Sequence, residues 1–443
     1  MRAPESQANT DTALAEIAWL SANNPDQVYH SLMHQINVDS LRRCFDRLDG
    51  RKAIGVDQVS KAMYGENLTA NLEELIARMK RMAYRPGPVR QVLIPKEGKK
   101  GATRPLGISN FEDKLVQKRM QDILENIYEP LFYDFSYGFR PNRSCHDAVR
   151  DMRGHLFNEE VEVVIDVDLA NFFGKIDHQI VKDMLGMKIK DSKFMRYIAR
   201  MFKAGVLADG ELSMSDEGVV QGSCCSPVIS NIVAHYVIDT WLEETVKPLM
   251  KGMVKVFRYA DDLVICCRYE EDAKRIKTVL GKRLAKYKLE LNEEKTSMVN
   301  FSKINCRRGI KQESFEFLGF RFYLGKSLKG GIIPKLKTSG KRFRSKLNNV
   351  KAWAKRIRNK IPLGAIWKTF CAKLRGHVQY YGVSFNSKMV DKFIQEALKI
   401  IFKWLNRRSQ RKSFDWKKFN LFIERHPLPS TKIGTMGSKW GVD

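Results

Sequence analysis

The sequence lacks the features that mark membrane-inserted or exported proteins. It contains no run of about 18 apolar residues, the length that a membrane-spanning helix requires. The N-terminal residues Met1 to Glu5 show neither an apolar signal core nor the Arg-rich, acid-poor pattern of a transit peptide. We therefore expect a cytoplasmic protein, with the bacterial cytoplasm as its compartment and no membrane partner.

The chain also lacks a cysteine pattern for metal binding. None of its eight cysteines forms a C-x-x-C pair. The adjacent pairs Cys224–Cys225 and Cys266–Cys267 do not have the ligand spacing of zinc ribbons or zinc fingers. We expect reduced, mostly buried thiols and no structural metal.

Acidic residues are scarce, most of all near the C-terminus. The 443-residue chain has 78 Lys and Arg against 50 Asp and Glu, a formal net charge of +28. Between Lys326 and Arg425 there are 27 basic residues and only four acids, a net charge of +23. A surplus of this size predicts a polyanionic partner, most simply nucleic acid, and it places the main binding surface in the C-terminal part.

Helical and strand-like segments are mixed along the chain. Apolar residues recur at helical spacing at 31–82 (with a loop at 52–57), 111–131, 177–204, 227–242, 270–288 and 339–408. Strand-like runs occur at 89–95, 161–168, 254–259, 263–267, 298–301 and 315–323. Because the two kinds of element do not alternate strictly, the pattern predicts an α+β fold.

Three aspartates are the strongest candidates for chemistry. The runs 254–259 and 263–267 predict a hairpin with Asp261 and Asp262 at its tip, and Asp168 ends a buried strand. Carboxylates at such ends are costly unless they bind a hard cation. Two Mg²⁺ ions about 3.5–4 Å apart can clamp the attacking 3′-hydroxyl and the leaving pyrophosphate of an in-line displacement. Ordinary turn chemistry is the alternative for an isolated Asp-Asp pair, so the surrounding motifs decide.

Those motifs form an ordered series. The blocks are Gly55-Val56-Asp57; Ile94-Pro95-Lys96 with Arg104-Pro105-Leu106-Gly107-Ile108; Ser136-Tyr137-Gly138-Phe139-Arg140-Pro141-Asn142-Arg143-Ser144; Asp166-Val167-Asp168 through Phe172-Phe173; Gln221-Gly222 with Ser226-Pro227; Tyr259-Ala260-Asp261-Asp262; Leu291-Asn292-Glu293-Glu294-Lys295-Thr296; and Phe317-Leu318-Gly319-Phe320. In this order the chain resembles the reverse transcriptases encoded by group II introns, over about residues 50–325 and in extension to 430.

The resemblance implies a right-hand polymerase, with fingers and a palm built on an antiparallel sheet, followed by an α-helical thumb or maturase domain. It implies RNA-directed DNA synthesis with deoxynucleoside triphosphates, a DNA primer and an RNA template. The implied catalytic and metal-binding residues are Asp168, Asp261 and Asp262, which would hold two Mg²⁺ ions. A backbone carbonyl of Val167 or of Leu169 is a further candidate ligand.

The resemblance also implies residues around the nucleotide and the template. Lys96 and Arg104 would grip the triphosphate, Phe173 would select deoxynucleotides as a steric gate, and Phe172 fits a core role better. Other implied contacts are those of Gln221 and Gly222 with the sugar and templating pair, of Lys295 with nearby phosphates, and of Arg140 and Arg143 with the template backbone. For Lys295 the alternative is an ordinary surface lysine. For Arg140 and Arg143 the alternative is a solvated loop. The chain departs from the family at Gly174, where an acid is usual, and at Ser223-Cys224-Cys225.

The basic C-terminal stretch would be the thumb or maturase region. Leu374 to Tyr381 is its most recognisable block, and Arg375, Arg407 and Arg408 are the candidate RNA contacts. We expect an N-terminal extension at 1–57, fingers and palm at 58–325, the basic helical domain at 326–430 and a tail at 431–443. We expect the form without an endonuclease domain.

Intron RNA is then the expected second partner, with roles in splicing and retrohoming. Two alternatives stay open. One is a reverse transcriptase recruited to a bacterial defence or CRISPR system, and the other is a non-catalytic RNA-binding splicing factor. The intact aspartates speak against the second alternative, and the oligomeric state is not predicted.

Overall fold

The computed structural model describes residues 5–95, 101–208, 210–219, 222–408 and 414–430. The chain forms two compact units. The first comprises Met1–Lys96, Gly101–Cys145 and Val167–Ser297, and the second comprises Glu97–Lys100, His146–Asp166 and Met298–Asp443. Helices and mainly antiparallel sheets occur together, which confirms the predicted α+β class.

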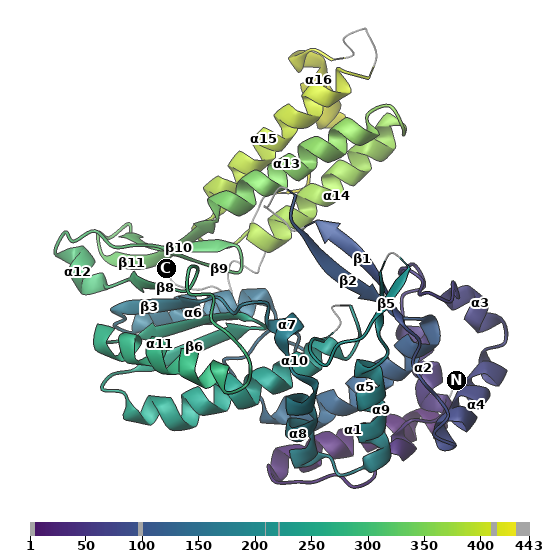
Figure 1. Ribbon diagram of the computed structural model, residues 1–443. Helices are drawn as coiled ribbons and strands as arrows, with labels where there is room; N and C mark the ends of the chain where they lie inside the picture. Colours follow the sequence, from purple (N-terminus) through teal and green to yellow (C-terminus); the bar gives the residue numbers. More distant parts are fainter. Residues whose placement is uncertain (1–4, 96–100, 209, 220–221, 409–413, 431–443) are drawn as a thin grey trace. The chain divides into compact units, whose positions relative to one another are not determined.

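Helices dominate the start of the first unit (Figure 1). They are α1 (Glu5–Asn23), α2 (Val38–Arg47), α3 (Lys61–Glu66), α4 (Leu68–Lys80) and α5 (Phe111–Tyr128), with short turns η1 (Met33–Gln35) and η2 (Glu129–Leu131). Helix α2 begins with a capping box, in which the Asn37 side chain accepts from the Ser40 amide and Ser40 Oγ accepts from the Asn37 amide. Helix α5 carries Leu115, Met120 and Ile123 at zero exposure, so it is the core helix of this unit.

A four-stranded sheet of this unit has the order β2-β1-β4-β5. Its strands are β1 (Val89–Pro95), β2 (Thr103–Ile108), β4 (Val206–Ala208) and β5 (Glu211–Ser213). Strands β1 and β2 pair antiparallel from Arg90↔Ile108 to Pro95↔Thr103, while β1 and β4 pair parallel. The short strands β4 and β5 were not predicted.

The remaining elements of the first unit carry the acidic hairpin. They are α7 (Phe172–Lys175), α8 (His178–Lys188), α9 (Ser192–Phe202), α10 (Ser226–Ala234), η5 (Lys247–Leu249), β6 (Val254–Tyr259), β7 (Asp262–Cys267) and α11 (Glu270–Ala285). Helix α10 continues directly into two π-helical segments, η3 (His235–Asp239) and η4 (Trp241–Val246). Such wide turns are rare and are frequent at functional sites.

The second unit combines strands with a helical bundle. Its elements are α6 (Cys145–Asn158), β3 (Val163–Val167), β8 (Ser297–Asn300), α12 (Lys303–Arg307), β9 (Phe315–Phe317), β10 (Phe320–Lys326), β11 (Ile332–Thr338), α13 (Gly340–Ile357), α14 (Leu363–Tyr381), α15 (Ser387–Leu405) and α16 (Trp416–Arg425). Strands β3 and β8 are neighbours in one sheet, and β11, β10 and β9 form a second, antiparallel sheet. The predicted helical region at 339–408 consists of α13, α14 and α15, whereas α6, β11 and α16 were not predicted.

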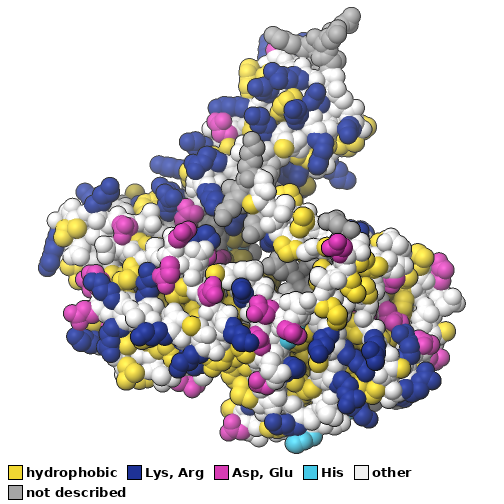
Figure 2. Space-filling model, in the orientation of Figure 1, with side chains coloured by type: hydrophobic (Ala, Val, Ile, Leu, Met, Phe, Trp, Pro, Cys, Tyr) yellow, Lys and Arg dark blue, Asp and Glu magenta, His cyan; other side chains and the backbone are white. Residues whose placement is uncertain are grey.

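The basic residues of the bundle lie largely on its surface. In the face that Figure 2 shows, Lys and Arg side chains cover α13 to α16 and few acidic side chains lie among them. The buried side is apolar, with Phe370, Leu374 and Ala397 at zero exposure. Within the described residues, no helix combines the length and the apolar character that crossing a membrane would need.

Candidate active site

The two adjacent aspartates lie at the tip of the β6–β7 hairpin. Tyr259 pairs with Asp262, so the connecting turn consists of Ala260 and Asp261. This confirms the predicted hairpin, with β7 starting one residue earlier than expected. Ala260 has φ +58, the left-handed conformation that tight hairpin turns need and that costs a residue with a Cβ roughly 1 kcal/mol.

The segment before α6 packs against this turn. The Tyr137 amide donates to the Arg258 carbonyl over 2.8 Å, and the Arg258 amide donates to the Phe135 carbonyl over the same distance. A Cβ on Gly138 would lie 2.3 Å from the Ala260 nitrogen. Only glycine therefore allows this close approach, which explains one glycine of the Ser136–Ser144 block.

Asp168 lies directly after β3 and is held through its backbone. Its carbonyl accepts from the Asn292 amide over 2.8 Å, and its amide donates to Thr296 Oγ1 over 3.2 Å. Lys295 Nζ lies 3.3 Å from Asp168 Oδ1, so the predicted phosphate-contacting lysine is beside a predicted metal ligand. Both side chains keep about half their surface in solvent, at 51% and 41% exposed.

The backbone around Asp168 bears on the two further candidate ligands. An antiparallel bridge pairs Leu169 with Leu291, and its hydrogen bonds use the Asp168 carbonyl and the Ala170 amide. Val167 is the buried last residue of β3. The bridge bonds involve the carbonyl of neither Val167 nor Leu169, and both remain candidates.

The charge of Asp168 acts on the carboxyl group of Asp261. Desolvation raises the pKa of Asp261, its own backbone amide opposes this, and the negative charge of Asp168 raises the pKa further. By surface area both Asp261 and Asp262 are exposed at the tip, with Asp262 at the start of β7. Carboxylates that lie close enough to repel one another form an arrangement that a divalent cation stabilises, so the residues fit Mg²⁺.

The described residues hold no ready group of three or more His, Cys, Asp or Glu side chains in metal-binding geometry. Mg²⁺ is commonly held by one or two carboxylates together with substrate phosphates.

The paired aromatic residues differ in burial. Phe172 is 2% exposed and belongs to the core, whereas Phe173 is half-buried. The Phe173 ring meets Phe139 edge-on at 6.4 Å, and Phe139 is 49% exposed with φ +58. Phe139 is thus a second aromatic of this region whose role the sequence did not indicate.

The family departure at Gly174 has a local explanation. Asn171 has φ +47, and a Cβ on Gly174 would lie 2.4 Å from the Asn171 side-chain nitrogen. The Asn171 amide occupies the space that a side chain at 174 would need.

The predicted nucleotide contacts are only partly described. Lys96 and Gln221 lie outside the described residues. Arg104 is exposed on β2, opposite Ile94 of β1. Gly222 has φ +113, and a Cβ there would lie 2.3 Å from the Gly107 carbonyl, so the Gly222 loop packs against β2.

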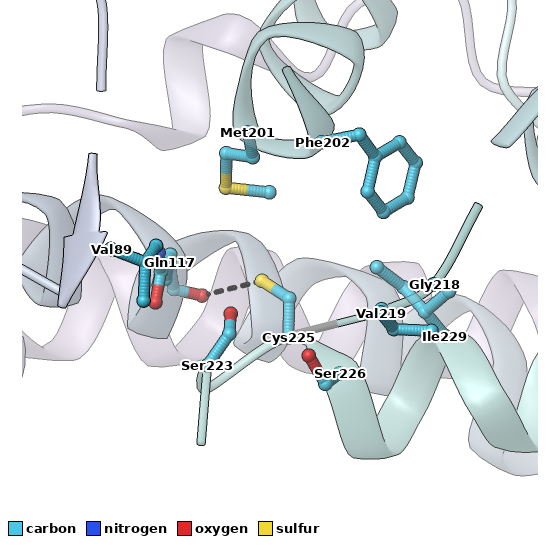
Figure 3. Close-up of a pocket in the computed structure, with 10 residues that line it drawn as sticks. All are labelled: Val89, Gln117, Met201, Phe202, Gly218, Val219, Ser223, Cys225, Ser226 and Ile229. Carbon is cyan, nitrogen blue, oxygen red and sulfur yellow. Dashed lines mark hydrogen bonds between the residues drawn. The ribbon is translucent and has the colours of Figure 1, made fainter. Parts of the chain in front are cut away.

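A small cavity lies among residues of β1, α5, α9 and α10 (Figure 3). Met201 and Phe202 line one side, Val219 and Ile229 line another, and Cys225 closes the base. The Cys225 thiol donates to the Gln117 carbonyl over 2.9 Å. Burial raises the Cys225 pKa well above its usual range, so this thiol is a packing group, as predicted for the cysteines.

The two arginines of the Ser136–Ser144 block have different environments. Arg140 is buried, pairs with Glu129 and donates to the Tyr133 and Ser136 carbonyls over 2.7 and 2.8 Å. Its guanidinium is therefore engaged inside the fold, and its predicted contact with the template stays a prediction. Arg143 is partly exposed and pairs with Asp134 at 2.6 Å.

The predicted RNA contacts of the second unit lie on its helices. Arg375 is exposed on α14. Arg407 and Arg408 follow α15, and the Arg407 guanidinium lies 5.3 Å from the centre of the Trp404 ring. Arg358 covers the same ring at 5.1 Å.

Sequence reasoning missed a buried polar group behind the hairpin. Arg258 is 1% exposed and pairs with Asp239, which is fully buried on η3. Asn231 of α10 joins them. The sequence offered one sign of this group, because Arg258 stands at an inward-facing position of a predicted strand. Nothing in the sequence marked Asp239 as its partner.

These elements agree with the family to which the sequence belongs. Residues 94–322 match the family described as reverse transcriptase (RNA-dependent DNA polymerase). The chain belongs to this family.

Among its relatives, the chain is 30% identical over 353 residues to the protein YkfC of Escherichia coli, across 71% of this chain and 88% of that protein. It is 29% identical over 351 residues to the group II intron-encoded protein LtrA of Lactococcus lactis, across 66% of this chain and 58% of LtrA. It is 36% identical over 172 residues to the 91 kDa protein in the cob intron of Schizosaccharomyces pombe, across 39% of this chain and 21% of that protein. The group of reverse transcriptases and maturases of group II introns, named from the motifs alone, is confirmed.

Proposed function

We propose that the chain is an RNA-directed DNA polymerase of right-hand architecture that extends a primer 3′ end by two-Mg²⁺ catalysis. The observation that carries the proposal is the hairpin tip at which Asp261 and Asp262 are adjacent, within range of the charge of Asp168. Membership of the reverse transcriptase family supports the reaction type.

Each residue of the site has a part in this proposal. Asp168, Asp261 and Asp262 hold the ions, which when bound would promote attack by the 3′-hydroxyl and neutralise the leaving pyrophosphate. Lys295 beside Asp168 and the exposed Arg104 supply positive charge for phosphate oxygens. The half-buried Phe173 is the steric gate, because a ring under the sugar would clash with a 2′-hydroxyl.

We further propose that the protein binds its host intron RNA to assist splicing and retrohoming. Similarity to a group II intron-encoded protein and to a protein in a cob intron supports this role. The net charge of +23 between Lys326 and Arg425 supplies the polyanion-binding surface. The candidate contacts are Arg143, Arg375, Arg407 and Arg408.

Primer extension tests the polymerase proposal. The purified full chain is given a DNA primer on an RNA template, deoxynucleotides and Mg²⁺ at low salt. We expect extension that depends on the template and stops when Mg²⁺ is chelated. Absence of extension at every Mg²⁺ concentration contradicts the proposal.

Intron splicing tests the second role separately. RNA from the flanks of the gene is incubated with the wild-type chain and with the Asp261→Asn plus Asp262→Asn variant. We expect both proteins to promote splicing, because the RNA-binding surface does not require the carboxylates. Splicing that neither protein accelerates contradicts the maturase role.

A further inference from the structure

The buried arginine behind the hairpin has every donor occupied. A guanidinium carries five N–H donors in a fixed fork. Arg258 Nε donates to Asp239 Oδ1 over 2.7 Å, and Nη2 donates to Asp239 Oδ2 over 2.5 Å and to Ser136 Oγ over 2.7 Å. Nη1 donates over 3.1 Å both to Asn231 Oδ1 and to the Ala260 carbonyl. The five bonds fix the plane of the group.

Two of these contacts reach the turn that carries Asp261. The Ala260 carbonyl belongs to the residue in the left-handed conformation, so Arg258 stabilises the strained position itself. Asn231 accepts from Arg258 and donates through Nδ2 to the Gly138 carbonyl over 2.7 Å. Gly138 is the residue whose absent side chain lets the backbone reach Ala260. The turn is therefore held through its own carbonyl and through Gly138 beside it.

A buried ion pair of this kind is expensive if stability is its only use. Arg258 and Asp239 are 1% and 0% exposed, and desolvation of such a pair often offsets its attraction. Replacement of similar pairs by apolar residues is often neutral or stabilising, whereas a polar pair fixes geometry through directed hydrogen bonds. Here the fixed geometry is that of the acidic turn.

We propose that Arg258, Asp239 and Asn231 are positioning residues that set the orientation of the Ala260–Asp261 turn and thereby the affinity of the site for divalent metal. The inference rests on the proposed function, because it assigns these residues to the metal site of that reaction. None of the three touches substrate in this account, and they act through the turn.

The variant Asn231→Ala tests the inference while it leaves the buried ion pair in place. It removes one acceptor of Arg258 and the donor to Gly138. The matched control is Ser230→Ala on the same helix, where a buried hydroxyl has no partner among the described residues. Binding of Mn²⁺ to the full chain without nucleic acid is followed by electron paramagnetic resonance, with the Asp261→Asn plus Asp262→Asn variant as the zero reference.

We expect Asn231→Ala to weaken Mn²⁺ binding by about 10- to 100-fold, the range for groups that orient metal ligands, and Ser230→Ala to leave it unchanged. Affinity for primed RNA should be equal in both variants, which separates a positioned metal site from general unfolding. A folded Asn231→Ala variant with the Mn²⁺ affinity of Ser230→Ala overturns the inference.

A second variant covers the case in which single substitutions do not fold. Arg258→Met combined with Asp239→Leu removes both charges and replaces them with apolar side chains of similar length. We expect this protein to fold and to show the same metal-binding defect. A folded double variant with wild-type metal affinity overturns the inference.

The two proposals fail in distinguishable ways. A wild-type Mn²⁺ site that persists in the Asp261→Asn plus Asp262→Asn variant, or no Mn²⁺ site at all, contradicts the proposed function and the inference with it. A wild-type site that depends on those carboxylates but not on Asn231 contradicts the inference alone.

Discussion

At the scale of single residues, burial decides which side chains are available for chemistry. Arg140 and Arg143 stand three residues apart in one loop, yet Arg140 is buried against Glu129 and Arg143 remains partly exposed. Phe172 and Phe173 are adjacent, yet only Phe172 is a core residue. Phe173 is therefore the more accessible of the two rings, which supports the gate role proposed for it.

The steric-gate role of Phe173 predicts a change in sugar selectivity. Phe173→Ala should raise ribonucleotide incorporation relative to deoxynucleotide incorporation by at least about tenfold, because a difference of 1.4 kcal/mol in a steric contact has that effect. Single-nucleotide addition on primed RNA measures the ratio. Phe172→Leu is the control, since it alters the core but not the exposed ring. An unchanged ratio in Phe173→Ala would show that another residue selects the sugar.

Two buried histidines predict acid sensitivity. Desolvation lowers the pKa of both His235 and His377 from 6.5 to about 4, aided by the charges of Arg258 and Lys346 respectively. Because the folded protein favours the neutral rings, their contribution to stability is complete above pH 6.5. It is lost as the pH falls from 6.5 to about 4, by roughly 3 kcal/mol for each histidine.

His377 offers the cleaner test of this effect. Its ring stacks on Phe393 at 3.5 Å, and neither ring nitrogen has a partner among the described residues. His377→Phe should therefore fold and lose less thermal stability than the wild type between pH 7 and pH 4.5. Thermal unfolding at the two pH values measures the difference, and an equal loss in both proteins would contradict the assignment.

At the scale of elements, the sequence pattern predicts single strands and hairpins, but it does not predict where two backbone segments come into close contact. The hairpin β6–β7 was predictable because its two apolar runs are separated by a short acidic segment. The contact of Gly138 with Ala260 was not, because it joins residues far apart in sequence through backbone atoms. The Arg258–Asp239 pair was not predictable either, because its two residues lie in different elements, β6 and the π-helical segment η3.

A glycine pair tests the close approach. Gly138→Ala places a Cβ 2.3 Å from the Ala260 nitrogen, so we expect a loss of about 1–3 kcal/mol in unfolding free energy and a displaced turn. Gly154→Ala on α6 meets nothing within 4 Å and should instead stabilise its helix by about 0.5–1 kcal/mol. Denaturant unfolding measures the change in unfolding free energy of both variants. Equal changes in the two variants would contradict the role given to Gly138.

At the scale of the whole molecule, the sequence revealed chemistry and charge better than it revealed boundaries. Ordered motifs identified the family before any fold was known, because such a series reflects a complete site. Charge counting located the basic region, since charge is additive along the chain. The elements α6, β4, β5, β11 and α16 were not predicted. The predicted domain limits at 57, 325 and 430 stay predictions.

The basic region predicts how binding responds to salt. Each phosphate contact releases counterions, so the affinity for RNA should fall linearly with salt on logarithmic axes. Arg375→Gln should reduce the slope by about one and weaken binding similarly for unrelated sequences. Lys274→Gln, which removes a surface charge of α11 paired with Glu270, is the control. An unchanged slope would place Arg375 outside the RNA-binding surface.

The central claim is that Asp168 works with the aspartates of the hairpin as one metal-dependent catalytic group. The most direct measurement is the single-turnover rate of one deoxynucleotide addition by Asp168→Asn, compared with Asp183→Asn on α8. We predict that Asp168→Asn lowers the rate by more than about 100-fold with primed-RNA affinity retained, while Asp183→Asn matches the wild type. A rate within a few-fold of the wild type for Asp168→Asn would contradict the account.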